Sequence, residues 1–239
     1  MIRYYRAMKR MQTGLLALCA MTSAADGSDG TDVLVFGGTG RLGAPMVRLL
    51  VEAGDSVTVF ARPTSDRSRL AGLTVSYVIG DLTDADSVVE AVKGKSFRVV
   101  IDATARDAGG GRFYDTSMRN MLRAVADSHV RQFILLGSVG AGENMRQFPN
   151  LGFERMRDVM NAKGEAEALL RDSGINYTII RSGIVKVDGT PATGTARLTE
   201  DDRVLGTVTR PDLAALAVQC LDNPACLNKI FHAEGVGPR

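Results

Sequence analysis

The feature that most constrains this chain is a glycine-rich turn that directly follows a short apolar run. The run VLVF at 33–36 leads into GGTGRLG, which comprises Gly37, Gly38, Thr39, Gly40, Arg41, Leu42 and Gly43. Apolar residues then recur at helical spacing as far as Gly54, so the turn joins a strand to a helix. Glycine permits the tight turn and a close approach of the backbone, and the free amides at the helix start attract phosphate. The pattern predicts that these seven residues bind the diphosphate of a dinucleotide.

The rest of the chain repeats the alternation of strand and helix. Short apolar or β-branched runs predict strands at 33–36, 56–60, 74–80, 98–105, 132–138 and 176–183. Helical periodicity predicts helices at 42–53, 84–92, 116–128 and 154–172. Strands that alternate with helices pair in parallel through right-handed crossovers. The expected fold is α/β, a doubly wound parallel sheet of the Rossmann type with helices on both faces.

The last part of the chain has a different pattern. Residues 184–206 are polar and look irregular, 211–221 predict an amphipathic helix, and 229–233 predict an edge strand. This segment is too short for an independent domain. We expect a small C-terminal lobe that folds over the carboxyl ends of the strands and shapes a substrate pocket.

The first 24 residues differ from the remainder in composition. The basic residues Arg3, Arg6, Lys9 and Arg10 precede an apolar run at 14–21 and small residues at 22–24. This is the layout of a secretory signal, and an organellar transit peptide or a later start methionine would look similar. The apolar run is too short to span a bilayer. We predict a non-structural leader at 1–24, a linker at 25–32 and a single domain at 33–239.

The charge balance and the cysteines narrow the classes of partner. The 239 residues include 29 basic and 27 acidic side chains, and the net charge of +2 gives no support for nucleic-acid binding. The three cysteines and two histidines lack the spacing of a metal site. We therefore interpret the cysteines as packing thiols, and pairing of Cys220 with Cys226 is considered only for an exported chain. We expect a small-molecule substrate, no membrane insertion of the mature domain, and a monomer or homodimer.

The end of the second expected strand indicates which dinucleotide is bound. NAD sites usually carry an acid there, whereas this chain has Arg62, 24 residues after Gly38. Arg41 adds a second guanidinium within the glycine-rich turn. Guanidinium groups suit a 2′-phosphate, so the sequence predicts NADP(H) as the cofactor. Free NADP(H) favours the cytoplasm or an organelle interior, although the leader leaves export possible.

Several segments together resemble an atypical short-chain dehydrogenase/reductase. They are VLVFGGTGRLG, VFARP, GDLTD, LLGSVGA, a K-x-E in the following helix, YTIIRSG and TRPDLA. The resemblance covers 32–234 and is to the NAD(P)H-binding, NmrA-like branch that includes the biliverdin-reductase-B type. It implies that Asp81 and Leu82 border the adenine, that Ala103 and Thr104 pass beside the cofactor ribose, that Ser138 lies near the nicotinamide, and that Lys163 holds the nicotinamide ribose. From the residues alone, Asp81 is also explained as a turn or N-cap residue, and Lys163 as an exposed helix lysine.

The usual chemistry of that superfamily is incomplete in this chain. Its typical members use as acid a tyrosine four residues before the lysine, and that position is Val159 here. Ser138 and Lys163 remain as candidate catalytic residues, while Tyr114 is interpreted as a pocket wall and His232 as a surface or edge residue. Reduction of a conjugated acceptor can take its proton from solvent.

Two functional hypotheses follow from these residues. The first is an NADPH-dependent reductase of a small carbonyl, quinone or flavin-like acceptor. The alternative is a non-catalytic NADP(H)-binding redox sensor or scaffold of the NmrA type.

Overall fold

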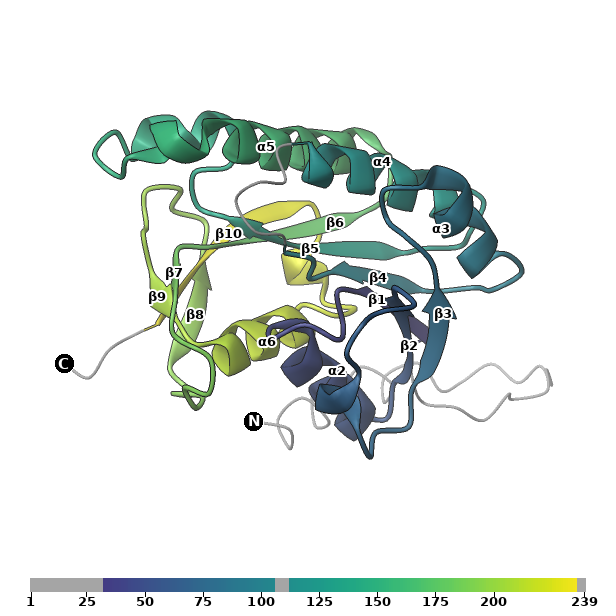
Figure 1. The fold of residues 1–239 in the computed structure, drawn as a ribbon. Coiled ribbons are helices and arrows are strands. Elements are labelled where there is room, and N and C mark those ends of the chain that lie inside the picture. The colour runs from purple at the N-terminus through teal and green to yellow at the C-terminus, as the bar shows by residue number, and fades with distance from the viewer. Residues whose placement is uncertain (1–31, 106–111, 236–239) are drawn as a thin grey trace, which may run out of the picture.

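One eight-stranded sheet organises the protein (Figure 1). The computed structural model describes residues 32–105 and 112–235, so the predicted leader and nearly all of the predicted linker lie outside the described residues. The strand order is β3 (Ser76–Ile79), β2 (Ser56–Ala61), β1 (Asp32–Phe36), β4 (Val99–Asp102), β5 (Gln132–Ser138), β6 (Tyr177–Ser182), β10 (Lys229–Gly235) and β8 (Ala196–Thr199). Neighbouring strands from β3 to β10 are parallel, and β8 alone is antiparallel to its neighbour in this sheet. The predicted Rossmann-type sheet is therefore confirmed.

Helices cover both faces of this sheet (Figure 1). One face carries α3 (Ala85–Val92), α4 (Phe113–Val125) and α5 (Arg157–Asp172), and the other carries α2 (Gly43–Ala53) and α6 (Arg210–Gln219). The side chains of β1 show why both faces must be covered. Val33 and Val35 belong to the core shared with α2 and α6, whereas Leu34 and Phe36 belong to the core shared with α3, α4 and α5. A strand that is buried on both sides has no polar alternation.

The boundaries of two helices differ from those expected. The helix α4 begins at Phe113, before the expected residue 116, and ends at Val125. The helix α5 begins at Arg157, because residues 153–156 form a 3-10 turn, η3 (Phe153–Met156). Short 3-10 segments at helix ends are common, and periodicity alone does not separate them from the helix.

The C-terminal part contains more strand than the sequence predicted. Within the segment expected to be irregular, β7 (Ile184–Val185) pairs with β9 (Thr207–Val208), and β8 joins the main sheet. The strand β10 lies between β6 and β8, so its prediction as an edge strand was wrong. The side chain of His232 on β10 is consequently buried, with 1% of its surface exposed, and is not at a surface or edge.

The last helix also departs from expectation. The prediction that it is amphipathic was wrong, because every residue of α6 except Gln219 is buried or half-buried. Its side chains pack against α2 and the strands on one face of the sheet. After α6 the chain doubles back through η4 (Pro224–Cys226), which brings the Cα atoms of Cys220 and Cys226 to 5.5 Å. These two cysteines form a disulfide, so their interpretation as packing thiols was wrong.

The remaining short elements are η1 (Ser68–Leu70), after β2, and η2 (Gly142–Gln147), after β5. In the part of the chain that the structure describes, none of the helices has the length and hydropathy that a membrane span requires.

Candidate functional site

The glycine-rich turn connects β1 to α2 with a tightly packed backbone. Gly37 has φ +74°, and its carbonyl accepts a hydrogen bond of 3.0 Å from the amide of Gly40. A Cβ atom at Gly43 would lie 2.2 Å from the carbonyl oxygen of Gly37, so only glycine fits at this crossing. The first turn of α2 has neither a side-chain cap nor an acidic residue. Ala44 already donates its amide to the Gly40 carbonyl at 2.9 Å, and Pro45 has no amide hydrogen. The amides that can meet an anion are therefore those of Arg41, Leu42 and Gly43, which end the glycine-rich turn.

The adenosine side of the candidate site is more exposed. Arg62 directly follows β2 with its side chain in solvent, and Arg41 projects from the glycine-rich turn and pairs with Asp188. Asp81 forms a turn in which its carboxylate accepts hydrogen bonds from the amide and hydroxyl of Thr83. The N-cap of α3 is Asp84, so Asp81 is a turn residue and not the cap.

Leu82, which was predicted to border the adenine beside Asp81, is buried. The side chain of Leu82 is buried in the core, and its carbonyl accepts a hydrogen bond of 2.8 Å from Asn120.

Ala103 and Thr104 follow β4 and pass beside the glycine-rich turn, where the backbone of Ala103 would be 2.7 Å from a Cβ atom on Gly37. The structure thus places Ala103 and Thr104 next to the glycine-rich turn, and their contact with the cofactor ribose stays a prediction.

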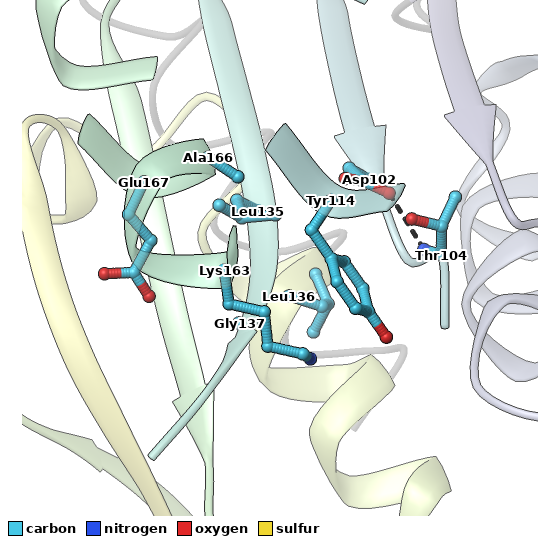
Figure 2. Close-up of a pocket in the computed structure, with 9 residues that line it drawn as sticks. All are labelled: Asp102, Thr104, Tyr114, Leu135, Leu136, Gly137, Lys163, Ala166 and Glu167. Carbon is cyan, nitrogen blue, oxygen red and sulfur yellow. Dashed lines mark hydrogen bonds between the residues drawn. The ribbon is translucent and has the colours of Figure 1, made fainter. Parts of the chain in front are cut away.

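Lys163 and Ser138 meet at the carboxyl end of β5. The ammonium Nζ of Lys163 donates a hydrogen bond of 2.8 Å to Ser138 Oγ. It also lies 4.3 Å from the centroid of the Tyr114 ring, within the range of a cation–π contact. Figure 2 shows the Lys163 chain beside the Tyr114 ring, with the amine and the phenol oxygen directed the same way. Lys163 is therefore held between two elements, and its interpretation as an exposed helix lysine is excluded.

Two buried carboxylates flank this lysine. Asp102, at the end of β4, accepts a hydrogen bond of 2.8 Å from the Thr104 amide, and Glu167 lies one turn after Lys163 on α5. These side chains line a small cavity together with Tyr114 (Figure 2). Burial raises the pKa of Asp102 and of Glu167, and burial lowers the pKa of Lys163. The two carboxylates act in the opposite direction to burial and favour the charged form of Lys163.

Glu167 has a second partner on the sheet. Arg181 on β6 donates two hydrogen bonds to its carboxylate, of 2.6 Å from Nη2 and 3.2 Å from Nε. The carboxylate reaches the sheet surface because residue 137 is glycine, where a Cβ atom would lie 3.0 Å from Glu167 Oε1. This bidentate pair fixes the face of α5 that carries Lys163.

The sequence analysis missed Asp102, Glu167 and Arg181. One signal was available for each acid, since Asp102 ends a continuous apolar strand and Glu167 follows Lys163 at i+4 spacing. The pairing of Glu167 with Arg181 had no local signal. It joins α5 to a strand that follows it in the chain.

Comparison with known proteins identifies the family of the chain. The family model described as NAD(P)H-binding matches residues 37–224, which is more than half of the chain. Sanguinarine reductase from Eschscholzia californica is 26% identical over 262 residues, covering 89% of this chain and 93% of the relative. Other curated relatives are covered less completely, down to 34% of their length.

Solved structures share the fold. The anaerobilin reductase ChuY from Escherichia coli O157:H7 has a TM-score of 0.73 at 22% identity, covering 87% of this chain and 99% of that one. A short-chain dehydrogenase/reductase from Veillonella parvula, solved in complex with NADP, has a TM-score of 0.65 at 17% identity, covering 86% and 94%. These structures show a shared fold, and the family match over 37–224 confirms the resemblance to the NAD(P)H-binding branch.

Proposed function

The chain belongs to the family of NAD(P)H-binding proteins, and we propose that it is an NADPH-dependent reductase of a small carbonyl, quinone or flavin-like acceptor. The observation that carries the proposal is the half-buried Lys163 hydrogen-bonded to Ser138 at the end of β5. Burying a charged lysine costs desolvation free energy, and a lysine with only a surface role would not need to be buried.

Different residues are proposed to bind different parts of the cofactor. The glycine-rich turn holds the diphosphate through its backbone amides up to Gly43, and Arg41 and Arg62 hold the 2′-phosphate. Lys163 has three ammonium donors, of which one reaches Ser138, and the others orient the nicotinamide ribose. When bound, the reduced nicotinamide supplies a hydride. Relatives that are named reductases, of sanguinarine and of anaerobilin, support this class of reaction.

The acceptor is proposed to be apolar and conjugated. Leu205 and Ile184 remain partly exposed, at 37% and 54%, where the chain leaves β6. A Cβ atom on Gly183 would lie 2.9 Å from a methyl of Leu205, which places Leu205 directly over the end of β6. In the sheet register Ser182 of that strand pairs with Ser138. Apolar groups at the end of β6, the strand next to β5, suit a flat acceptor. Such an acceptor takes its proton from solvent, since Val159 supplies none.

The proposal is tested by a screen of NADPH oxidation with quinones, flavins and aldehydes. With a reducible acceptor, Lys163→Ala should lower kcat/KM by about 100-fold, because a misplaced hydride donor is costly in rate. Lys93→Ala is the matched control, since Lys93 is an exposed lysine paired with Glu90 on the surface. A Val159→Tyr substitution should not be needed for activity. If no acceptor is reduced although NADPH binds, the alternative of a redox sensor of the NmrA type is favoured.

We also propose that residues 1–24 are a leader that adds nothing to the fold, and that the domain works as a monomer or homodimer. The need for free NADPH favours the cytoplasm or an organelle interior, whereas the Cys220–Cys226 disulfide favours an oxidising compartment and leaves export open. The proposal follows from the basic and apolar layout of the leader and from the need for free NADPH. Cell fractionation together with sequencing of the mature N-terminus tests it. A processed protein in an exported fraction would agree with the disulfide and would contradict the cytoplasmic or organellar location.

A further inference from the structure

A turn between β7 and β8 places an acidic side chain against the glycine-rich turn. Asp188 Oδ2 lies 3.5 Å from Nε of Arg41 and 3.9 Å from Nη2 of Arg69. Arg41 belongs to the glycine-rich turn, and Arg69 belongs to η1, which follows β2. Two guanidinium groups from separate elements therefore converge on one carboxylate oxygen.

The turn that carries Asp188 has a defined backbone. The carbonyl of Val187 accepts hydrogen bonds from the amide of Thr190, at 3.3 Å, and from its hydroxyl, at 2.8 Å. Just before the turn, the amide of Lys186 donates to the carbonyl of Val208 at 3.0 Å. Asp188 is thus directed toward the arginines by the fold of the turn.

The arginines are also placed by their elements. Leu70, next to Arg69, is 2% exposed and packs in the core shared with α2, so η1 is anchored to the body of the domain. The three charged side chains themselves are exposed, at 64% for Arg41, 42% for Arg69 and 47% for Asp188. Exposed ion pairs are weak, so a stronger anion can displace the carboxylate.

We propose that Arg69 joins Arg41 and Arg62 at the 2′-phosphate, and that Asp188 occupies this position in the free protein and competes with the cofactor for Arg41 and Arg69. The inference rests on the proposed use of NADPH, and it makes Asp188 a specificity-determining residue. In a dinucleotide fold the adenosine ribose lies beside the end of the second strand, near both arginines. A phosphate carries a charge of about −1.5 to −2 and three acceptor oxygens, so it binds two guanidinium groups better than a carboxylate does.

The consequence differs between the two nucleotides. NADPH must displace Asp188 to reach the arginines, whereas NADH has a neutral hydroxyl at that position and leaves the ion pairs intact. Asp188 therefore lowers the affinity for NADPH without lowering the affinity for NADH. Asp188 thus reduces the preference for NADPH over NADH that Arg41 and Arg69 would give without it.

The test compares Asp188→Asn with the native full-length chain. Nicotinamide fluorescence reports the binding of NADPH and NADH, and the chain has no tryptophan to interfere. Adenosine 2′,5′-bisphosphate and 5′-AMP, used as competitors, probe the 2′-phosphate without the nicotinamide. Asp172→Asn is the matched control, because it removes the same charge from an exposed position at the end of α5.

We expect Asp188→Asn to tighten NADPH and adenosine 2′,5′-bisphosphate by about three- to tenfold, in the range of one or two exposed ion pairs. NADH and 5′-AMP should bind unchanged, and Asp172→Asn should change none of the four. In an Arg41→Ala, Arg69→Ala background the gain should disappear. The inference is overturned if Asp188→Asn leaves NADPH unchanged, weakens it, or tightens NADH equally. These are binding measurements, so an acceptor screen without activity would count against the reductase alone.

Discussion

Replacing Arg181 by methionine should destabilise the protein in a way that depends on pH. The change removes both hydrogen bonds to Glu167, whose side chain is 4% exposed, and leaves its carboxylate in the interior. Breaking a buried ion pair costs about 3–5 kcal/mol. We expect about 3 kcal/mol, at the lower end, because Lys163 and Arg171 still act favourably on the Glu167 carboxylate. For a domain of this size, that loss lowers Tm by about 6–12 °C.

The pH dependence follows from the direction of the pKa shift. Burial already raises the pKa of Glu167, and loss of Arg181 should raise it further. A carboxyl whose pKa is raised on folding contributes full stability below its unfolded pKa, and this contribution is lost as pH rises through the folded pKa. The deficit of Arg181→Met should therefore be small near pH 4–5 and largest near pH 8.

Urea unfolding followed by far-UV circular dichroism measures this deficit. The double variant Glu167→Leu, Arg181→Met is the control, since replacing a buried pair by apolar groups is often neutral. It should recover to within about 1 kcal/mol of the native chain. A double variant that is as unstable as the single one, or a deficit that is independent of pH, would refute the reasoning.

Three further predictions concern other parts of the site. Gly43→Ala should weaken NADPH binding by at least about tenfold with an unchanged circular dichroism spectrum, because its Cβ atom would lie 2.2 Å from the Gly37 carbonyl oxygen and displace the turn. The Tyr114 ring contacts Lys163, so Tyr114→Phe should keep most of kcat/KM for an acceptor found in the screen, and Tyr114→Leu should lose most of it. Equal losses of kcat/KM in the two variants would instead implicate the phenol hydroxyl. Burial lowers the pKa of His232, so stability should fall as pH drops below about 6.5, by at most about 1.4 kcal/mol per pH unit. His232→Asn can keep a donor to the Val204 carbonyl, and unfolding midpoints at pH 7.5 and 5.5 should show a flatter dependence for this variant.

The local pattern of the sequence was sufficient for the central fold. The six strands from β1 to β6 and the helices between them follow from periodicities that extend over a few residues. The turn at 37–43 was also readable, because its glycines reflect local steric limits at Gly37 and Gly43. Such features depend on neighbours in the chain, and these are visible in the sequence.

Tertiary structure decided what the pattern left undetermined. His232 is buried because β8 pairs outside β10, and a strand of four residues within a polar segment gives no signal for that pairing. Lys163 reaches Ser138 across 25 residues of sequence, and Glu167 reaches Arg181 across 14. Asp188 meets Arg41 only because the turn after β7 crosses to the start of α2. Charges like these are placed by the packing of distant elements, and their energies depend on a burial that local sequence does not encode.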